Sequence, residues 1–356
     1  MQGLQQGLHP AGPGPWNVAL LGPWGIGKTS LLRRFAQMTA EFDPPALAVT
    51  LTLTSSTGGL EEMGGRLLVY AHEEIRGQTR WPDRLRAELE RWQPSGTVGA
   101  LRASRQGDQR AAAGHPDLYL ELLRLWREHL HNRVAGMVLL LDDAHLLLTR
   151  DPGALLSLRA VFQDLQGAGA RYPLVITGPE GLFEAVRDVS EPVTRFFERM
   201  ALGPFSLTDT AEAIRAALRA AGDPFEVGDD AVDLLWRRTD GHPFFVAFAM
   251  RDLFTGPGSR LTAEHVEAAW PAIAAHLASE RFAVEWQSAT PGERDVLKTL
   301  AEGRDGAPVT RALGRSGATL LARLLRKGLV VRSGRGEYQL YHAVFAGFAR
   351  LLGGGG

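Results

Sequence analysis

One stretch near the beginning of the sequence combines residue types that bind phosphate groups. It matches the pattern Gly-x-x-x-x-Gly-Lys-Ser/Thr and lies between a short apolar run and a helical pattern. Glycines let successive backbone N–H groups turn toward phosphate oxygens, and the N-terminus of the following helix adds partial positive charge. The lysine reaches the β- and γ-phosphates, and the next hydroxyl is a ligand for Mg²⁺. The predicted nucleotide-binding residues are Gly22, Pro23, Trp24, Gly25, Ile26, Gly27, Lys28, Thr29 and Ser30.

An acidic pair follows a second apolar run, Met137–Leu141. We expect Asp142 to hold Mg²⁺ through water, and Asp143 to orient the attacking water or accept its proton. The alternative for Asp143 is a cap on the turn that follows it. Together with Lys28 and Thr29, the pair predicts an enzyme that binds ATP and Mg²⁺ and hydrolyses ATP. Because many ATPases of this layout carry Glu in place of Asp143, slow hydrolysis and absent hydrolysis both stay open.

Two other polar positions are candidates for the catalytic set. Thr177 ends an apolar run and is placed to hydrogen-bond the γ-phosphate or the attacking water, or else it is a strand-terminal threonine without a ligand. Arg195 or Arg199 could project from one subunit toward a neighbour's phosphate, and the alternative is a surface ion pair. The predicted catalytic residues are Asp143, Lys28, Thr177 and Arg199.

Apolar runs alternate with helical patterns through the first part of the chain, which is typical of a doubly wound α/β fold with a parallel sheet. Residues 76–116 interrupt this alternation with few large apolar side chains, and they are predicted to form a partly flexible insertion. The sequence therefore predicts a P-loop NTPase core over residues 1–203. Its four expected strands are Asn17–Leu21, Leu47–Thr54, Met137–Leu141 and Pro173–Thr177.

The rest of the chain predicts two further domains. Strand patterns stop after the strand-like Met200-Ala201-Leu202, so residues 204–284 are expected to form an all-helical lid. Residues 285–356 begin with a capping box, in which Thr290 and Glu293 cap each other's backbone, and continue as three helices, a β-hairpin and a last helix. Helices followed by a hairpin are typical of a C-terminal winged helix-turn-helix.

Composition and charge exclude several classes of protein. There is no cysteine, which excludes disulfide frameworks, thiolate metal sites and cysteine nucleophiles. The N-terminus lacks a basic-then-apolar signal pattern and no apolar run is long enough to span a bilayer, so we expect a cytoplasmic protein without membrane contact. Among the ten histidines there is no spacing typical of a metal site, so no metal beyond Mg²⁺ is expected.

The near-zero formal charge of −1 is a cancellation between two parts of the chain. Residues 291–356 carry eleven basic and five acidic side chains, a net charge of +6, while the rest carries 28 and 35, a net charge of −7. The basic module is therefore a candidate for contact with double-stranded DNA or with an acidic protein surface. A packing or protein-interaction role for it is equally open. The candidate DNA contacts are Arg323, Arg326, Lys327, Arg332 and Arg335.

The ordered set of motifs resembles a P-loop ATPase of the AAA+ and STAND group, and it is similar to the archaeal ATPase family and to origin-initiator ATPases. The resemblance covers nearly the whole chain and is carried by Gly22–Ser30, Leu139–Asp143, Thr177, Phe197–Ser206 and Gly241-His242-Pro243. In STAND proteins a Gly-x-Pro of the lid lies against the nucleotide, which the resemblance implies for Gly241 and Pro243. Initiator-type lids carry a sensor arginine where this chain has Phe244 and Phe245.

The resemblance and the motifs lead to two hypotheses for function. The first is an ATP-driven switch whose nucleotide state controls the winged helix, either in a homo-oligomer or with a partner protein. The second is a DNA-binding protein in which bound nucleotide is mainly structural. A GTPase or metabolite kinase is disfavoured, because the sequence has no Asn-Lys-x-Asp motif. The biological process stays open, since this architecture serves many of them.

Overall fold

The computed structural model describes most of the chain, which divides into two compact units. One unit comprises Met1–Gly22 and Lys28–Leu202, and the other comprises Pro23–Gly27 and Gly203–Gly356. The first unit ends one residue before the predicted end of the ATPase core at residue 203. Of the predicted insertion, residues 78–113 lie outside the described part. The described residues are 16–39, 41–42, 45–77, 114–183, 191–223, 225–253, 260–303, 316–325, 327–334 and 337–353.

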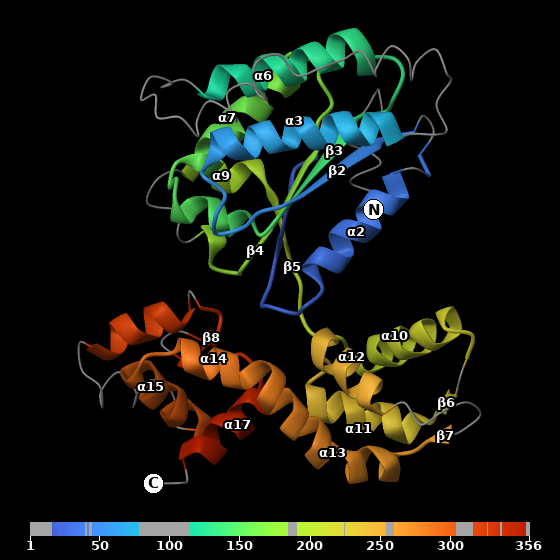
Figure 1. Cartoon of the computed structure of the whole chain (residues 1–356), viewed down its shortest axis with the longest axis vertical. Helices are drawn as coiled ribbons and strands as arrows, with labels where there is room; N and C mark the ends of the chain where they lie inside the picture. Colours follow the sequence, from blue (N-terminus) through green and yellow to red (C-terminus); the bar gives the residue numbers. More distant parts are fainter. Residues whose placement is uncertain are drawn as a thin grey trace. The chain divides into compact units, whose positions relative to one another are not determined.

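The first unit is built on a five-stranded parallel sheet in the order β2-β3-β4-β1-β5 (Figure 1). This confirms the predicted doubly wound α/β fold and adds a fifth strand to the four expected. This fifth strand includes Met200 and Ala201 of the strand-like Met200-Ala201-Leu202, but all four of its residues are exposed, so the apolar pattern there is weak. The strands are β1 (Val18–Leu21), β2 (Leu47–Thr52), β3 (Met137–Asp142), β4 (Leu174–Gly178) and β5 (Glu198–Ala201).

Helices cover both faces of the sheet, which explains the continuous apolarity of β1, β3 and β4. Alternate strand residues face different cores: Leu21 and Leu139 pack on the side of α3, whereas Leu20 and Leu140 pack on the side of α2. Figure 1 shows α3 and α6 on one side of the sheet and α2 on the other. The helices are α2 (Lys28–Thr39), α3 (Leu60–Gly77), α6 (Gly114–Leu125) with η1 (Trp126–Leu130), η2 (Ala144–Thr149), α7 (Ala154–Gly167) and α9 (Glu191–Phe196).

The strand order brings the carboxyl ends of three strands together. Because β4 lies between β3 and β1, the glycine-rich loop after β1 is near the acidic pair at the end of β3 and near Thr177 of β4. In open parallel sheets, ligands bind outside the carboxyl ends of the strands, where the strand order reverses. The fold thus positions the predicted phosphate-binding and acidic residues at one edge of the sheet.

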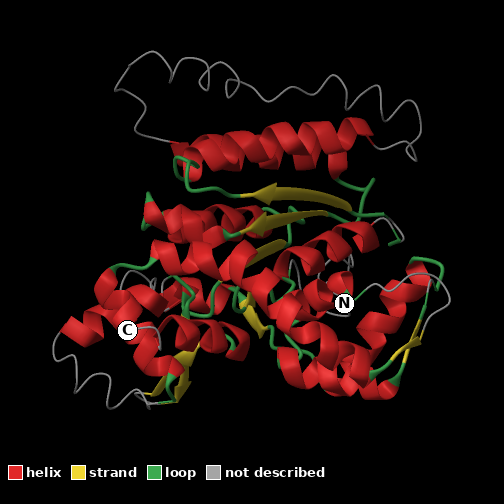
Figure 2. Cartoon of the chain, turned by 60° about the horizontal axis from the view of Figure 1, so that its bottom comes forward, coloured by secondary structure: helices red, strands yellow, loops and turns green. Residues whose placement is uncertain are grey.

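The first part of the second unit is helical, as predicted, with one short strand pair added (Figure 2). Ser206 begins it with a capping box on Asp209, and Pro243 starts α12, where a missing N–H is harmless. Its elements are α10 (Leu207–Ala220), β6 (Glu226–Val227), α11 (Asp229–Thr239), α12 (Pro243–Asp252), β7 (Arg260–Leu261), α13 (Ala263–Leu277), η3 (Ala278–Phe282) and α14 (Ala283–Ser288).

The remaining elements follow the predicted winged-helix order as far as the structure describes them. The capping box is present: the Thr290 N–H donates to Glu293 Oε2 at 2.8 Å, and the Glu293 N–H donates to Thr290 Oγ1 at 3.4 Å. The short helix expected near Val309–Leu313 lies outside the described residues. The observed elements are α15 (Pro291–Ala301), a helix over 316–325, the antiparallel pair β8 (Val330–Gly334) and β9 (Glu337–Leu340), and α17 (Ala343–Gly353).

The helical elements before residue 285 and the elements after it share one hydrophobic core. Phe245 of α12, Phe282 of η3 and Phe345 of α17 belong to the same buried cluster, and the predicted boundary between residues 284 and 285 falls inside α14. A division of the second unit into lid and winged helix therefore stays a prediction. Within the described residues, no helix is long and apolar enough to cross a membrane.

Candidate functional site

The glycine-rich loop has the backbone shape that its sequence predicts. Gly25 and Gly27 have φ values of +74° and +100°, a region that glycine adopts without strain. Lys28 is the first residue of α2, and its Nζ donates to the carbonyl oxygen of Gly22 at 2.8 Å. Left-handed glycines in such a loop let several backbone N–H groups point toward one concave, anion-binding surface at the helix N-terminus.

A hydrogen-bonded set joins the end of the loop to the ends of β3 and β4. The Thr29 hydroxyl donates to Asp142 Oδ2 at 2.6 Å, and the Thr177 hydroxyl donates to Asp142 Oδ1 at 2.6 Å. Asp142 is only 2% exposed and Thr177 is fully buried. Thr29 and Asp142 thus present hard oxygen atoms together, as a Mg²⁺ site requires. Among the described residues, no group of three or more His, Cys, Asp or Glu side chains is placed to hold a metal ion by itself.

Asp143 occupies a different environment from its neighbour. Its backbone is left-handed, with φ 58°, and its N–H donates to Thr177 Oγ1 at 2.9 Å. Its side chain makes no capping hydrogen bond to the 3-10 helix η2, so the observed geometry does not use it as a cap. Burial, and then the charge of Asp142, raise the pKa of Asp143, against the opposing effects of His145 and Lys28. A half-buried carboxylate with a raised pKa is a suitable proton acceptor.

Two basic groups near Asp143 also have shifted pKa values. Burial lowers the pKa of the Lys28 ammonium, although Asp143, Asp142 and Glu180 oppose the shift. Burial likewise lowers the pKa of His145, whose Nδ1 lies 3.8 Å from Asp143 Oδ1. Loss of hydration disfavours the charged form, and for a basic group this lowers the pKa. Phosphate oxygens would replace part of the water that the Lys28 ammonium has lost.

Thr177 and Arg199, the other two catalytic candidates, lie in unlike surroundings. The Thr177 hydroxyl donates a hydrogen bond to Asp142 and accepts one from the Asp143 backbone N–H, so in this arrangement it orients the acidic pair. Arg199 is an exposed residue of the edge strand β5, and its guanidinium lies 4.5 Å from the centroid of the Phe183 ring. A phosphate contact by either residue stays a prediction, as does a role for Arg195, which is exposed in α9.

In the second unit, the predicted Gly-x-Pro motif has a clear packing explanation. Gly241 has φ +64°, and a Cβ there would overlap the carbonyl oxygen of Phe205. The Phe205 N–H also donates to the Gly241 carbonyl at 2.9 Å. Pro243 opens α12, and His242 between them is 3% exposed. Sterics therefore require the glycine, and nucleotide contact by Gly241 and Pro243 stays a prediction.

We expect Gly241→Ala to lower the free energy of unfolding by about 2–5 kcal/mol. Left-handed backbone costs a non-glycine residue about 1–2 kcal/mol, and the overlap with Phe205 adds about 1–3 kcal/mol. Gly222→Ala is the matched control, because Gly222 has φ +82° with nothing within 4 Å of an added Cβ. It should lose only the conformational part, about 1–2 kcal/mol. Urea unfolding of both variants measures the difference, and equal losses would contradict the steric explanation.

Sequence reasoning missed the residues of the second unit that contact Trp24 of the loop. The His242 Nε2 lies 3.1 Å from the Trp24 carbonyl oxygen, and the Phe244 ring meets the indole edge-on at 4.6 Å. The Arg281 guanidinium carbon lies 3.6 Å from the centroid of the same indole. His242 lies within the Gly-x-Pro motif and Phe244 directly follows it, but no pattern marks Arg281, which is far from Trp24 in sequence.

The candidate DNA contacts differ in the exposure of their side chains and in the groups that those side chains contact. Arg323 and Arg332 are exposed, and the Arg332 guanidinium lies 5.9 Å from the Tyr338 ring centroid. Lys327 instead pairs with the buried carboxylate of Glu293 at 2.7 Å, which gives it a structural role in this fold. Arg326 and Arg335 lie outside the described residues. DNA contact by these five residues stays a prediction.

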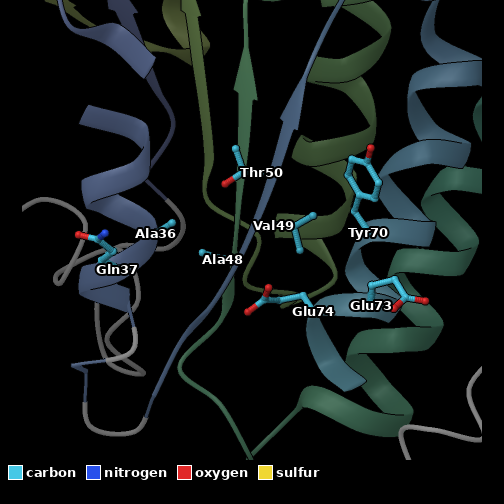
Figure 3. Close-up of a pocket in the computed structure, with 8 residues that line it drawn as sticks. All are labelled: Ala36, Gln37, Ala48, Val49, Thr50, Tyr70, Glu73 and Glu74. Carbon is cyan, nitrogen blue, oxygen red and sulfur yellow. The ribbon is translucent and has the colours of Figure 1, made fainter. Parts of the chain in front are cut away.

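Two cavities lie apart from the hydrogen-bonded set around Asp142. One, of about 530 Å³, opens along the outer edge of β2 between α2 and α3, where Tyr70, Glu73 and Glu74 face it (Figure 3). The other, of about 630 Å³, is largely apolar. It is lined by residues of α10 and α12, among them Pro243, and by Phe205, which lies just before α10. Neither is lined by residues of the glycine-rich loop or by the acidic pair.

Comparisons with known proteins bear on the fold. No protein-family model matches the sequence, and no curated protein matches it. The structure is similar to the Walker-type ATPase PABY2304 of Pyrococcus abyssi, with a TM-score of 0.61 and 18% identity, over 98% of this chain and 94% of that one. It is also similar to the ORC2 protein of Aeropyrum pernix in its ADPNP-ADP complexes, with a TM-score of 0.61 and 14% identity, over 99% and 90% of the two chains. The expected resemblance is thus confirmed at the level of the fold: the chain has the P-loop ATPase fold of archaeal Walker-type and ORC proteins.

Proposed function

We propose that this protein binds ATP with Mg²⁺ and hydrolyses it as a molecular switch of the AAA+ and STAND type. The observation that carries the proposal is the set formed by Thr29, Asp142 and Thr177 beside Lys28, at the carboxyl edge of the sheet. The ADPNP-ADP complexes of the similar Aeropyrum pernix protein support nucleotide as the ligand. Titration of the purified chain with ATP, with and without Mg²⁺, together with measurement of released phosphate, tests binding and hydrolysis separately.

Each residue of the set has a distinct part in the proposed reaction. The loop amides and the Lys28 ammonium bind the β- and γ-phosphates, and Thr29 and Asp142 hold Mg²⁺, which neutralises phosphate charge when bound. Thr177 holds the Asp142 carboxylate and the Asp143 backbone in place. Asp143 then accepts the proton of the water that attacks the γ-phosphate.

The switch acts, in this proposal, on the winged-helix part of the second unit. ATP binding changes the conformation of the helical lid. The moved lid in turn changes which surface of the winged helix is accessible to DNA or to a protein partner. Arg199 is proposed to act between subunits of a homo-oligomer, where an exposed edge strand is accessible to a neighbour. The shared core of the lid and winged-helix residues supports such coupling, because packed cores shift between discrete arrangements.

A second candidate is a DNA-binding protein in which the nucleotide is mainly structural. The observation that favours it is the net charge of +6 over residues 291–356, against −7 for the rest of the chain. Exposed guanidinium groups such as those of Arg323 and Arg332 contact phosphates of double-stranded DNA without reading sequence.

If the winged helix binds DNA, we expect Arg323→Ala with Arg332→Ala to weaken duplex binding and to flatten its salt dependence. Each lost phosphate contact reduces the slope of log affinity against log salt concentration by about 0.9, so the double variant should lose about 1.8. Arg219→Ala is the control, because Arg219 is an exposed arginine of α10, outside the basic module. Absence of duplex binding by the unaltered protein at low salt would rule out this role.

A further inference from the structure

Trp24 of the glycine-rich loop has a large side chain in a motif otherwise rich in small residues. It is 42% exposed, and Pro23–Gly27 packs with the second unit. There its indole contacts both the Phe244 ring, which it meets edge-on, and the Arg281 guanidinium, whose carbon lies 3.6 Å from the indole centroid. A planar guanidinium at that distance is attracted by the quadrupole of the indole face. Arg281 is thus a direct contact of the proposed phosphate-binding loop.

Arg281 is itself fixed by a chain of contacts that leads into the winged-helix part. One of its terminal nitrogens pairs with Glu285 Oε1 at 2.6 Å. The other carboxylate oxygen, Oε2, accepts a hydrogen bond from the Tyr341 hydroxyl at 2.8 Å. Glu285 is 8% exposed, and Tyr341 directly follows β9. The four side chains therefore form one continuous series, Trp24–Arg281–Glu285–Tyr341.

The chemistry of this series makes each member depend on the next. Burial raises the pKa of Glu285, while the Arg281 charge and the Tyr341 hydroxyl oppose that rise. The buried carboxylate needs both partners to remain ionised, and an ionised carboxylate in turn fixes the guanidinium. Loss of the Tyr341 hydroxyl would therefore loosen Arg281, and a loosened Arg281 would hold the indole less firmly.

We propose that Arg281 is a positioning residue for the phosphate-binding loop, and that Glu285 and Tyr341 couple nucleotide affinity to the winged-helix part. The inference rests on the proposed function, since it assumes that ATP binds at this loop. Arg281 stabilises the loop conformation in which Gly25 and Gly27 are already turned for phosphate, so it raises affinity by preorganisation. Because coupling free energies are reciprocal, ATP binding stabilises the Glu285–Tyr341 contact in return.

A double-mutant cycle on ATP affinity tests the coupling. We expect Arg281→Ala to weaken ATP binding about 3- to 30-fold, in line with the strength of a partly desolvated cation–π contact. Tyr341→Phe keeps the ring but removes the hydroxyl, and it should weaken binding about 2- to 5-fold, since it acts through the charged hydrogen bond to Glu285. Tyr341→Phe added to Arg281→Ala should have no further effect, because the series is already broken.

Two more variants separate positioning from a general loss of stability. Arg238→Ala is the matched control, because its guanidinium also lies near an indole, Trp270 at 5.7 Å, and also pairs with a glutamate, Glu267 at 2.6 Å, but does not contact the loop. It should leave ATP affinity unchanged. Arg281→Lys keeps the charge but not the planar contact, and it should restore part of the affinity.

The outcomes distinguish this inference from the proposed function. If the unaltered protein binds ATP but Arg281→Ala binds it equally well, the positioning role is wrong and the proposed function stands. Additive losses in the cycle would likewise overturn the coupling through Glu285. If the unaltered protein binds no ATP, the proposed function itself fails. Melting temperatures of all variants show whether a loss of affinity reflects a loss of folded protein.

Discussion

Lys28→Ala is expected to abolish measurable ATP binding while the protein stays folded. The ammonium makes charge-assisted contacts with two phosphates, each worth about 1.5–3 kcal/mol, so the affinity should fall at least about 100-fold. Stability should change little, because burial lowers the pKa of Lys28 and the charged group therefore gains no net stability from folding. Isothermal titration with ATP and thermal melting measure the two quantities.

Arg33→Ala is the control for this prediction. Arg33 is an exposed basic residue of the same helix, α2, and its side chain is one turn beyond the N-terminal site. Loss of its charge should leave ATP affinity within about twofold, as expected for a screened surface charge. If Lys28→Ala retained the affinity of the unaltered protein, the assignment of the nucleotide site would be wrong.

Asp143→Asn is expected to separate hydrolysis from binding. Removal of the proton acceptor should slow hydrolysis by about 10²–10⁴-fold, while ATP affinity should be retained because Lys28, Thr29 and Asp142 are intact. Asparagine tolerates the left-handed backbone of this position, φ 58°, so the loop conformation should persist. Phosphate release and equilibrium ATP binding are the two measurements. Equal hydrolysis by the variant would exclude Asp143 as the base.

The raised pKa of Asp143 also predicts how pH acts on both rate and stability. Hydrolysis should fall as the pH drops through a pKa above the ordinary aspartate range, because the base becomes protonated. A raised folded-state pKa means that the ionised carboxylate reduces stability above that pKa. Asp143→Asn should therefore melt at a higher temperature than the unaltered protein at neutral pH. The difference should shrink as the pH falls and Asp143 takes up its proton.

The central strands and the nucleotide loop were predictable because their signals are local. The apolar runs around Leu20 and Leu140 are strands covered on two faces, and the capping box at Thr290 is a hydrogen-bond pattern within four residues. The sequence indicated only the Met200-Ala201 part of the edge strand β5, because the other two residues, Glu198 and Arg199, are charged and exposed. The ion pair of Lys327 with Glu293 was also not predictable, because the two residues lie 34 positions apart in sequence and Glu293 becomes buried only on folding.

The sequence by itself determined the chemistry available at the site, because the spacing of Gly22, Lys28 and Thr29 depends only on neighbouring residues. Only the tertiary structure decided which distant groups serve it. Thr177 became the partner of Asp142 through the order of the strands, and Arg281 became the partner of Trp24 through the packing of the second unit. The physical reason is that such contacts are set by how buried surfaces fit together, and no period along the chain records that fit.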